Sequence, residues 1–252
     1  MNHTSTSELH KERGIGQFLV YVLVALFFVG AAIKWNSRQK ITNLSLKGNT
    51  YITTEEIQSL CTQDSTESNS TIDLAQTRSL VLQHPFVRNA SVEHINSNNV
   101  SITITERVPI AVLLLNDGSL KYVDEENVIL PYRVINGMAD LPLIRGLQKN
   151  SSLEIDTNYL QKCVALLNQV THETQKYIAN DISEMIVNRQ LGLLKLKTSE
   201  SNATILMGSM ETVEENLSKL NAMYEYCSKQ NNMRLQGLVD LRWKNKVIIR
   251  NS

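Results

Sequence analysis

The pattern of hydrophobic and polar positions predicts a strand and a helix directly after residue 40. Residues 41–46 form a short extended run, which the turn residues at 47–49 close. Thr53 and Glu56 then have the spacing of a capping box, in which each side chain bonds the backbone N–H of the other residue. Apolar residues follow on one helical face, namely Ile57, Leu60 and Cys61. A strand followed by a capped helix is therefore expected here.

A second helix and a β-hairpin are predicted next. The polar loop at 62–70 leads to the N-cap residue Asp73, and the His-Pro pair at 84–85 ends the helix. Apolar and polar residues then alternate over residues 100–105, which is typical of a strand with one buried face. An Asn-rich turn at 96–99 joins that strand to the one before it. We expect a strand-helix-helix-strand-strand domain at residues 41–108, with a core of Ile57, Leu60, Leu74, Val81, Ile102 and Ile104.

Strands dominate the pattern after Pro109, with two long helices between them. A hairpin is predicted at residues 110–123, with an Asn-Asp-Gly turn. Further strands are predicted at 182–187, 193–197, 203–207, 237–240 and 247–249. Two apolar stripes predict the helices, with Tyr159, Leu160, Cys163, Val164, Leu167 and Val170 in the first and Val213, Leu217, Leu220, Tyr224 and Cys227 in the second. The fold class expected is α+β, and the β domain at 109–252 is expected to be mostly antiparallel, with segregated sheets rather than βαβ repeats.

A run without charge at residues 15–33, apolar except for the amide Gln17 near its edge, lies ahead of these elements. At about 1.5 Å per residue, a helix of this length spans roughly 28 Å, which is close to the thickness of a bilayer's hydrocarbon core. A cleaved signal peptide and a buried core helix are the alternatives, and the apolar part of a signal peptide is usually shorter. We expect an uncleaved transmembrane helix that follows a tail of residues 1–14 and precedes a linker of residues 34–40.

The charges beside this run do not decide its orientation, because basic residues flank it on both sides. Long folded domains, however, translocate largely regardless of charge, and an anchor so near the N-terminus behaves as a signal-anchor. We therefore expect a single-pass protein with a cytoplasmic N-terminus and with residues 34–252 outside the cytoplasm. The flanking residues are Lys11 and Arg13 before the run, and Lys34, Arg38 and Lys40 after it.

Composition and reactive residues argue against several classes of function. The 25 basic residues balance the 25 acidic ones, so neither a nucleic-acid footprint nor a polybasic lipid patch is visible. Three widely spaced cysteines cannot form a disulfide framework, and Cys163 and Cys227 are interpreted as small buried hydrophobes. The histidines lack metal-ligand spacing, no nucleophile or phosphate-binding motif occurs, and the acidic cluster at 124–126 is interpreted as a solvated turn. We expect no enzyme, no metal, no cofactor and no nucleic-acid partner.

Four short motifs follow one another in a specific order. Residues 44–49 read LSLKGN, residues 84–92 read HPFVRNASV, residues 100–111 read VSITITERVPIA, and VDLRW at 239–243 is followed by VII at 247–249. In this order they resemble the bacterial cell-division family FtsQ, called DivIB in Gram-positive bacteria. The resemblance covers nearly the whole chain, and it implies a POTRA domain at 41–108 followed by an FtsQ-like β domain.

The resemblance also implies a function. Proteins of this family are scaffolds of the division septum in the cytoplasmic (inner) membrane. They recruit the small coiled-coil membrane proteins FtsB (DivIC) and FtsL and link them to septal cell-wall synthesis. Two other functions stay open, which are a membrane-anchored envelope adaptor of another system that uses a POTRA-like module, and an anchored cell-wall hydrolase.

The last predicted strand is the candidate partner site. A partner without a sheet of its own can add a strand to an exposed sheet edge, where backbone hydrogen bonds give affinity and alternate side chains give selectivity. The alternative is an edge that basic residues merely protect against aggregation, with Lys244, Lys246 and Arg250 in that role. The partner-binding residues expected are Arg242, Trp243, Val247, Ile248, Ile249 and Arg250, of which the resemblance places Arg242 at a charged, partner-facing position.

Overall fold

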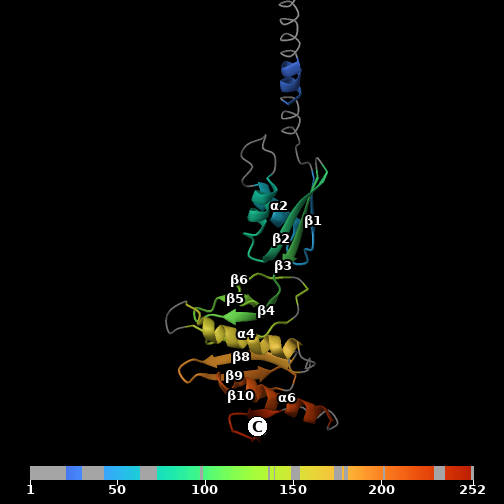
Figure 1. Cartoon of the computed structure of the whole chain (residues 1–252). Helices are drawn as coiled ribbons and strands as arrows, with labels where there is room; N and C mark the ends of the chain where they lie inside the picture. Colours follow the sequence, from blue (N-terminus) through green and yellow to red (C-terminus); the bar gives the residue numbers. More distant parts are fainter. Residues whose placement is uncertain are drawn as a thin grey trace, which may run out of the picture. The chain divides into compact units, whose positions relative to one another are not determined.

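The computed structural model divides the chain into two compact units, residues 1–106 and residues 107–252. Most of their helices and strands are labelled in Figure 1. The residues that the structure describes are 21–29, 43–62, 73–96, 99–135, 137–138, 140–148, 154–172, 178, 181–200, 202–229 and 236–250.

Only part of the expected transmembrane segment is among these residues. Residues 21–29 are helical, whereas the rest of 15–33, the tail at 1–14 and the linker at 34–40 lie outside the described residues. Within the described part of the chain, no helix combines the length and the apolar character needed to cross a bilayer. The anchor therefore stays a prediction.

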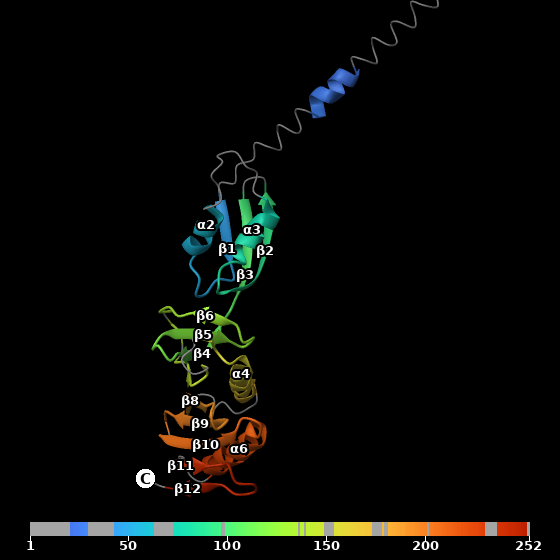
Figure 2. The ribbon, with the colours of Figure 1, turned by 90° about the vertical axis from the view of Figure 1, so that its left-hand side faces the viewer.

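The first unit contains a three-stranded sheet with two helices on one side of it (Figure 2). The strand order is β1-β3-β2, in which β1 runs parallel to β3 and β2 runs antiparallel to it. The predicted order of strand, helix, helix, strand and strand is confirmed. The bounds are β1 Asn43–Lys47, α2 Thr54–Thr62, α3 Leu74–Val81, β2 Val87–Asn96 and β3 Asn99–Glu106.

Both helices of this unit start as the sequence predicts. The backbone N–H of Thr53 donates to Oε2 of Glu56 at 3.1 Å, and the N–H of Glu56 donates to Oγ1 of Thr53 at 3.2 Å. Oδ1 of Asp73 accepts the N–H of Ala75 at 2.8 Å. These bonds satisfy backbone donors that the first helical turn leaves without an intrahelical partner.

The core of the first unit is close to the predicted set. Ile57, Val81 and Ile102 are completely enclosed. Leu60 and Leu74 are only half-buried, because each lies at an end of its helix, where fewer side chains surround it. The remaining predicted core residue, Ile104, is also buried.

The second unit is one nine-stranded sheet with two long helices. The strand order is β12-β11-β10-β9-β8-β7-β4-β5-β6. Every predicted strand and both helices are present, whereas β6 and β7 were not expected because three residues are too few to display a period. The bounds are β4 Pro109–Leu114, β5 Leu120–Asp124, β6 Ile129–Pro131, β7 Leu143–Arg145, α4 Thr157–His172, β8 Ile182–Asn188, β9 Leu193–Thr198, β10 Ala203–Ser209, α6 Val213–Lys229, β11 Gly237–Asp240 and β12 Ile248–Arg250.

The expectation of segregated sheets without βαβ units is wrong. The pairs β4–β7, β7–β8 and β10–β11 are parallel, and the helices α4 and α6 connect β7 to β8 and β10 to β11. Because β8 and β10 are both antiparallel to β9, all four connected strands point the same way. Two right-handed crossovers that run in the same direction place both helices on the same face, as Figure 2 shows.

The helix-covered face holds the core of the second unit. Along β9 the side chains alternate between buried and half-buried, so that Leu194 and Leu196 face the helices. Cys163 and Cys227, from α4 and α6, are buried in the same core, and burial raises the pKa of the Cys163 thiol to about 12. Both cysteines therefore pack as small hydrophobes, as predicted.

The acidic cluster at 124–126 is in part the solvated turn that was expected: Glu125 and Glu126 are exposed in a turn, whereas Asp124 is not solvated. Asp124 is only 2% exposed, and its carboxylate accepts a hydrogen bond from the guanidinium of Arg107 at 2.7 Å. The backbone N–H groups of Glu126 and Val128 also donate to it, at 3.0 and 2.8 Å. Asp124 is therefore a buried structural carboxylate that closes the turn between β5 and β6.

Glu106 and Arg107 are neighbours in the sequence, and each is bonded within its own unit. Oε1 of Glu106 accepts the backbone N–H groups of Thr50 and Ile52, both at 2.8 Å, and its Oε2 accepts that of Tyr51 at 2.9 Å. Arg107 donates to Asp124 and Glu126. The Glu-Arg pair of the VSITITERVPIA motif therefore has one structural role in each unit.

Candidate partner-binding edge

The last strand, β12, forms one edge of the nine-stranded sheet. It pairs antiparallel with β11, where Leu238 lies opposite Arg250 and Asp240 lies opposite Ile248. No described strand lies on its outer side. An edge strand of this kind presents backbone N–H and C=O groups with which another chain can pair. The strand begins at Ile248 rather than at Val247, one residue later than predicted.

The opposite edge of the sheet is less suited to accept a strand. That edge is β6, which contains Pro131 opposite Lys121. Proline has no backbone N–H and is a common way to blunt an edge strand. Since β12 contains no proline, it is the better template for strand addition.

Apolar side chains stand in solvent beside the β12 edge. The exposed fractions are 53% for Trp243, 39% for Val247 and 47% for Ile249, whereas Ile248 is half-buried. Large apolar side chains gathered at one exposed place are typical of binding surfaces. The structure thus brings together the predicted apolar residues of the site.

A groove with a volume of about 580 Å³ lies between α6 and the C-terminal segment. Half of its lining residues come from α6, which the sequence-based prediction did not include. One signal in the sequence could have indicated it: Tyr226 is an aromatic residue outside the apolar stripe of its helix. In the structure, 58% of Tyr226 is exposed. The lining residues are Lys219, Ala222, Met223 and Tyr226 of α6, and Asn245, Lys246, Val247 and Ile249 of the C-terminal segment.

Arg242 is bonded to Asp240 within the same segment. Its Nε and one terminal nitrogen donate to the two carboxylate oxygens of Asp240 at 2.8 and 2.7 Å. The pKa of Asp240 is lowered chiefly by this hydrogen bond, with a smaller contribution from Trp243, and the pKa of Arg242 is raised by the same pair. The guanidinium is half-exposed, so a partner would meet it as part of an ion pair.

Two family models together match residues 39–249 of the chain. The model described as FtsQ/DivIB, C-terminal related, matches residues 108–249, which is more than half of the chain. The chain belongs to the FtsQ/DivIB family. The model described as POTRA domain, FtsQ-type, matches residues 39–107. The family resemblance that the motifs carry is thereby confirmed, and the chain has a role in cell division.

Curated relatives carry the same family names. A cell division protein FtsQ of Rhodothermus marinus is 24% identical over 260 residues, which cover 98% of this chain and 92% of the relative. An FtsQ of Geobacter sp. is 25% identical over 202 residues, with 79% and 71% covered. A cell division protein DivIB of Clostridium acetobutylicum is 24% identical over 175 residues, with 69% and 67% covered.

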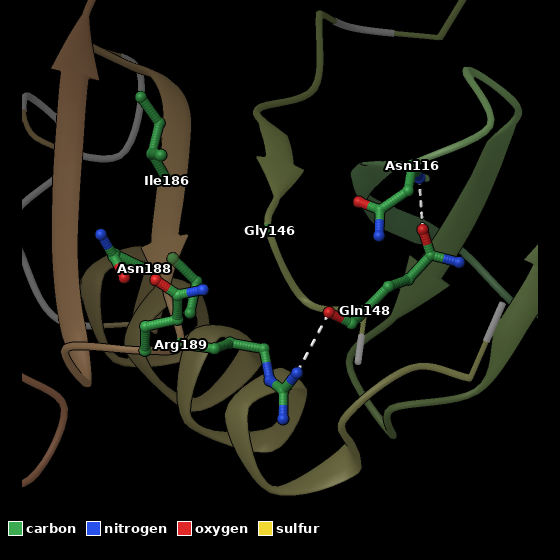
Figure 3. A pocket seen from close by; sticks show the side chains of 8 residues that line it. Asn116, Gly146, Gln148, Ile186, Asn188 and Arg189 are labelled. Atoms are coloured by element: carbon green, nitrogen blue, oxygen red, sulfur yellow. Dashed lines mark hydrogen bonds between the residues drawn. The ribbon is translucent and has the colours of Figure 1, made fainter. Parts of the chain in front are cut away.

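A second hollow, of about 600 Å³, lies in the FtsQ/DivIB C-terminal unit at the carboxyl ends of the parallel strands β4, β7 and β8. This is the end of an α/β sheet at which ligands often bind. Figure 3 shows Gly146 between Asn116 on one side and Ile186 and Asn188 on the other. The other lining residues are Gln148, Val187, Arg189 and Gln190.

The groups in this hollow bond one another. The side chain of Gln148 accepts the backbone N–H of Asn116, and Arg189 donates to the Gln148 carbonyl at 3.1 Å (Figure 3). Arg189 also donates to Asp156 at 2.9 Å. The lining contains amides, aliphatic side chains and this one paired guanidinium, so it offers no nucleophile with a neighbouring base. Elsewhere in the described residues, no three His, Cys, Asp or Glu side chains lie close enough to hold a metal ion.

Proposed function

We propose that this chain is a non-enzymatic scaffold of the division septum that binds small coiled-coil membrane proteins of the FtsB/DivIC and FtsL types and links them to septal cell-wall synthesis. The observation that carries the proposal is the unpaired outer side of β12 beside an apolar groove. Membership of the cell-division family FtsQ/DivIB supports the cellular process.

The docking mode proposed is strand addition. An extended segment of the partner pairs with residues 248–250 and becomes the next strand of the sheet, since the backbone groups on that side have no strand partner in the described residues. Apolar side chains of the segment that follows enter the groove beside Met223 and Tyr226. Trp243 supplies a large apolar contact of the kind that often dominates an interface.

The membrane topology is part of the proposal. Residues 15–33 form a single membrane anchor, with residues 1–14 in the cytoplasm and two folded domains outside it, a POTRA domain at 41–108 and a β domain at 109–252. The apolar run of the sequence supports the anchor, and the septal location is supported by the names of the relatives. In this arrangement β12 is accessible to partners that also face the outside of the cytoplasmic membrane.

A pair of proline variants tests the docking mode. Ile248→Pro removes an N–H from β12, whereas Ile129→Pro makes the same change in β6, the three-residue strand at the opposite edge. Binding of each full-length variant to the FtsB/DivIC-like protein of the same cell is measured after circular dichroism has shown that it is folded. We expect Ile248→Pro to abolish binding and Ile129→Pro to leave it unchanged. A folded Ile248→Pro variant that binds with unchanged affinity refutes the docking edge.

A further inference from the structure

Lys219 lines the groove and also bonds the turn that carries Trp243. Its ammonium group has three N–H donors. Three acceptors surround it, which are Oδ1 of Asn216 at 2.8 Å, the backbone carbonyl of Trp243 at 3.2 Å and Oε1 of Glu215 at 3.3 Å. The side chain is only 18% exposed. Each donor therefore has one acceptor, and the ammonium is fixed in one place.

Asn216 connects this ammonium to the sheet. It is 3% exposed, and its Nδ2 donates to the carbonyl of Met207 in β10 at 2.6 Å. The same nitrogen lies 3.3 Å from Oγ1 of Thr212. Since its amide nitrogen points to β10, its oxygen faces Lys219. A continuous chain of hydrogen bonds thus runs from Met207 through Asn216 and Lys219 to Trp243.

Trp243 has little core packing to hold it. Its side chain is 53% exposed, and its indole interacts with Asp240. Its carbonyl accepts the N–H of Lys246 across the turn at the long distance of 3.4 Å. The bond from Lys219 therefore adds the tie between the Trp243 backbone and α6, while Asp240 holds the indole.

We propose that Lys219 is a positioning residue of the docking site: by tying the Trp243 carbonyl to α6, it fixes the turn from which the half-exposed indole meets a partner. The inference rests on the proposed docking at β12. In this role Lys219 of α6 orders the turn that carries Trp243. Its consequence for binding acts through Trp243 and not through a direct contact of the ammonium with the partner.

The first test uses the free protein. Full-length chain with Trp35→Phe, reconstituted in nanodiscs, retains Trp243 as its one tryptophan. In this background Lys219→Met should lower the fluorescence anisotropy of Trp243 and increase its quenching by acrylamide, because the turn loses its tie to α6. Lys219→Arg keeps donors at the same place and should preserve both values.

Lys229→Met is the matched control for Lys219→Met. Lys229 also belongs to α6 and forms an ion pair with the glutamate four residues earlier, Glu225, at 2.6 Å. Its loss removes a lysine and a helix ion pair of the same spacing without touching the Trp243 carbonyl. The signal of Trp243 should therefore stay unchanged. Equal loss of anisotropy in both variants, or unchanged anisotropy in Lys219→Met, overturns the proposal.

The second test is a double-mutant cycle on binding to the FtsB/DivIC-like protein. Lys219→Met should weaken binding about tenfold, the scale of a hydrogen bond from a charged group. Added to Trp243→Ala, it should weaken binding further by no more than about twofold, since it acts through the residue already removed. Fully additive losses overturn the positioning role.

Different results refute the docking site and the positioning role of Lys219. If Trp243→Ala binds as tightly as the unchanged protein, the docking site itself is wrong and the role of Lys219 falls with it. If Trp243→Ala weakens binding but Lys219→Met does not, only the positioning role is refuted. Circular dichroism of every variant separates these outcomes from unfolding.

Discussion

At the residue scale, charged side chains in this protein bind backbone groups and organise turns. Glu106 accepts three consecutive backbone N–H groups, Asp124 accepts two, and Asp240 binds the side chain and the N–H of Arg242. A charged acceptor forms stronger hydrogen bonds than a neutral one. A backbone N–H that is buried without an acceptor destabilises the folded state. These carboxylates therefore stabilise connections between elements.

Replacement of Glu106 tests this role in the first unit. Glu106→Ala should lower the opening free energy of the amides at residues 50–52 by about 1–3 kcal/mol, because those donors lose their acceptor. Native-state hydrogen exchange measures it. Glu93→Ala, at an exposed position of β2, is the control and should change little. Equal protection in the Glu106 variant would contradict the role.

The Asp240–Arg242 pair predicts a dependence on acid. The pKa of Asp240 in the folded protein lies below its ordinary value of 3.8, so the unfolded state binds its proton more readily. The stabilisation is complete above about pH 4 and is lost as the pH falls through the lower folded-state value. In urea unfolding followed by Trp243 fluorescence, the difference in stability between unchanged protein and Asp240→Asn should therefore shrink on acidification. A difference that grows with acid would have the wrong sign.

At the scale of elements, the local periodicity of the sequence predicts most of the helices and strands but not how the strands pair. The capping box at Thr53, the N-cap at Asp73 and the stripes of α4 and α6 are local signals, and the structure confirms each. The strands β6 and β7 were missed because they are short. The parallel pairs were missed because strand direction depends on partners distant in the sequence, which no local pattern encodes.

The candidate site was predicted in part for the same reason. Trp243, Val247 and Ile249 could be named from the sequence because they lie in or beside the last predicted strand, and the structure shows that their side chains are exposed. Lys219, Met223 and Tyr226 were missed because the tertiary fold, and not the local sequence, places α6 beside the C-terminal segment. A local stretch of sequence can indicate the residues of the C-terminal segment, whereas the residues that α6 contributes to the groove are known only from the fold.

Strand β3 is the element whose burial supports the first unit most clearly. Ile102 is completely enclosed, so Ile102→Ala should cost about 2–5 kcal/mol of unfolding free energy through lost burial and the cavity left behind. Ile95→Ala on the neighbouring β2 is the matched control, since Ile95 is 58% exposed, and should cost less than about 0.5 kcal/mol. Denaturant unfolding measures both, and similar losses would contradict the assigned core.

At the scale of the whole molecule, the proposed membrane topology places residues 34–252 outside the cytoplasm. A reporter enzyme that is active only outside the cytoplasm, fused after Ser252, should be active, because one anchor at 15–33 places all later residues on that side. Replacing Lys34, Arg38 and Lys40 with Gln should leave the activity unchanged if the folded region sets orientation. If this fusion is inactive, and a second reporter that works only in the cytoplasm is active when fused at the same place, the topology is contradicted.

The central claim is that a partner adds a strand to β12, and hydrogen–deuterium exchange tests it most directly. The full-length protein is compared with and without the FtsB/DivIC-like protein, and exchange is followed in peptides that cover the two sheet edges, β12 and β6. Strand addition predicts slower exchange in the complex of those amides of residues 248–250 that face away from β11, and unchanged exchange at residues 129–131. A formed complex in which residues 248–250 exchange as fast as in the free protein would contradict the claim.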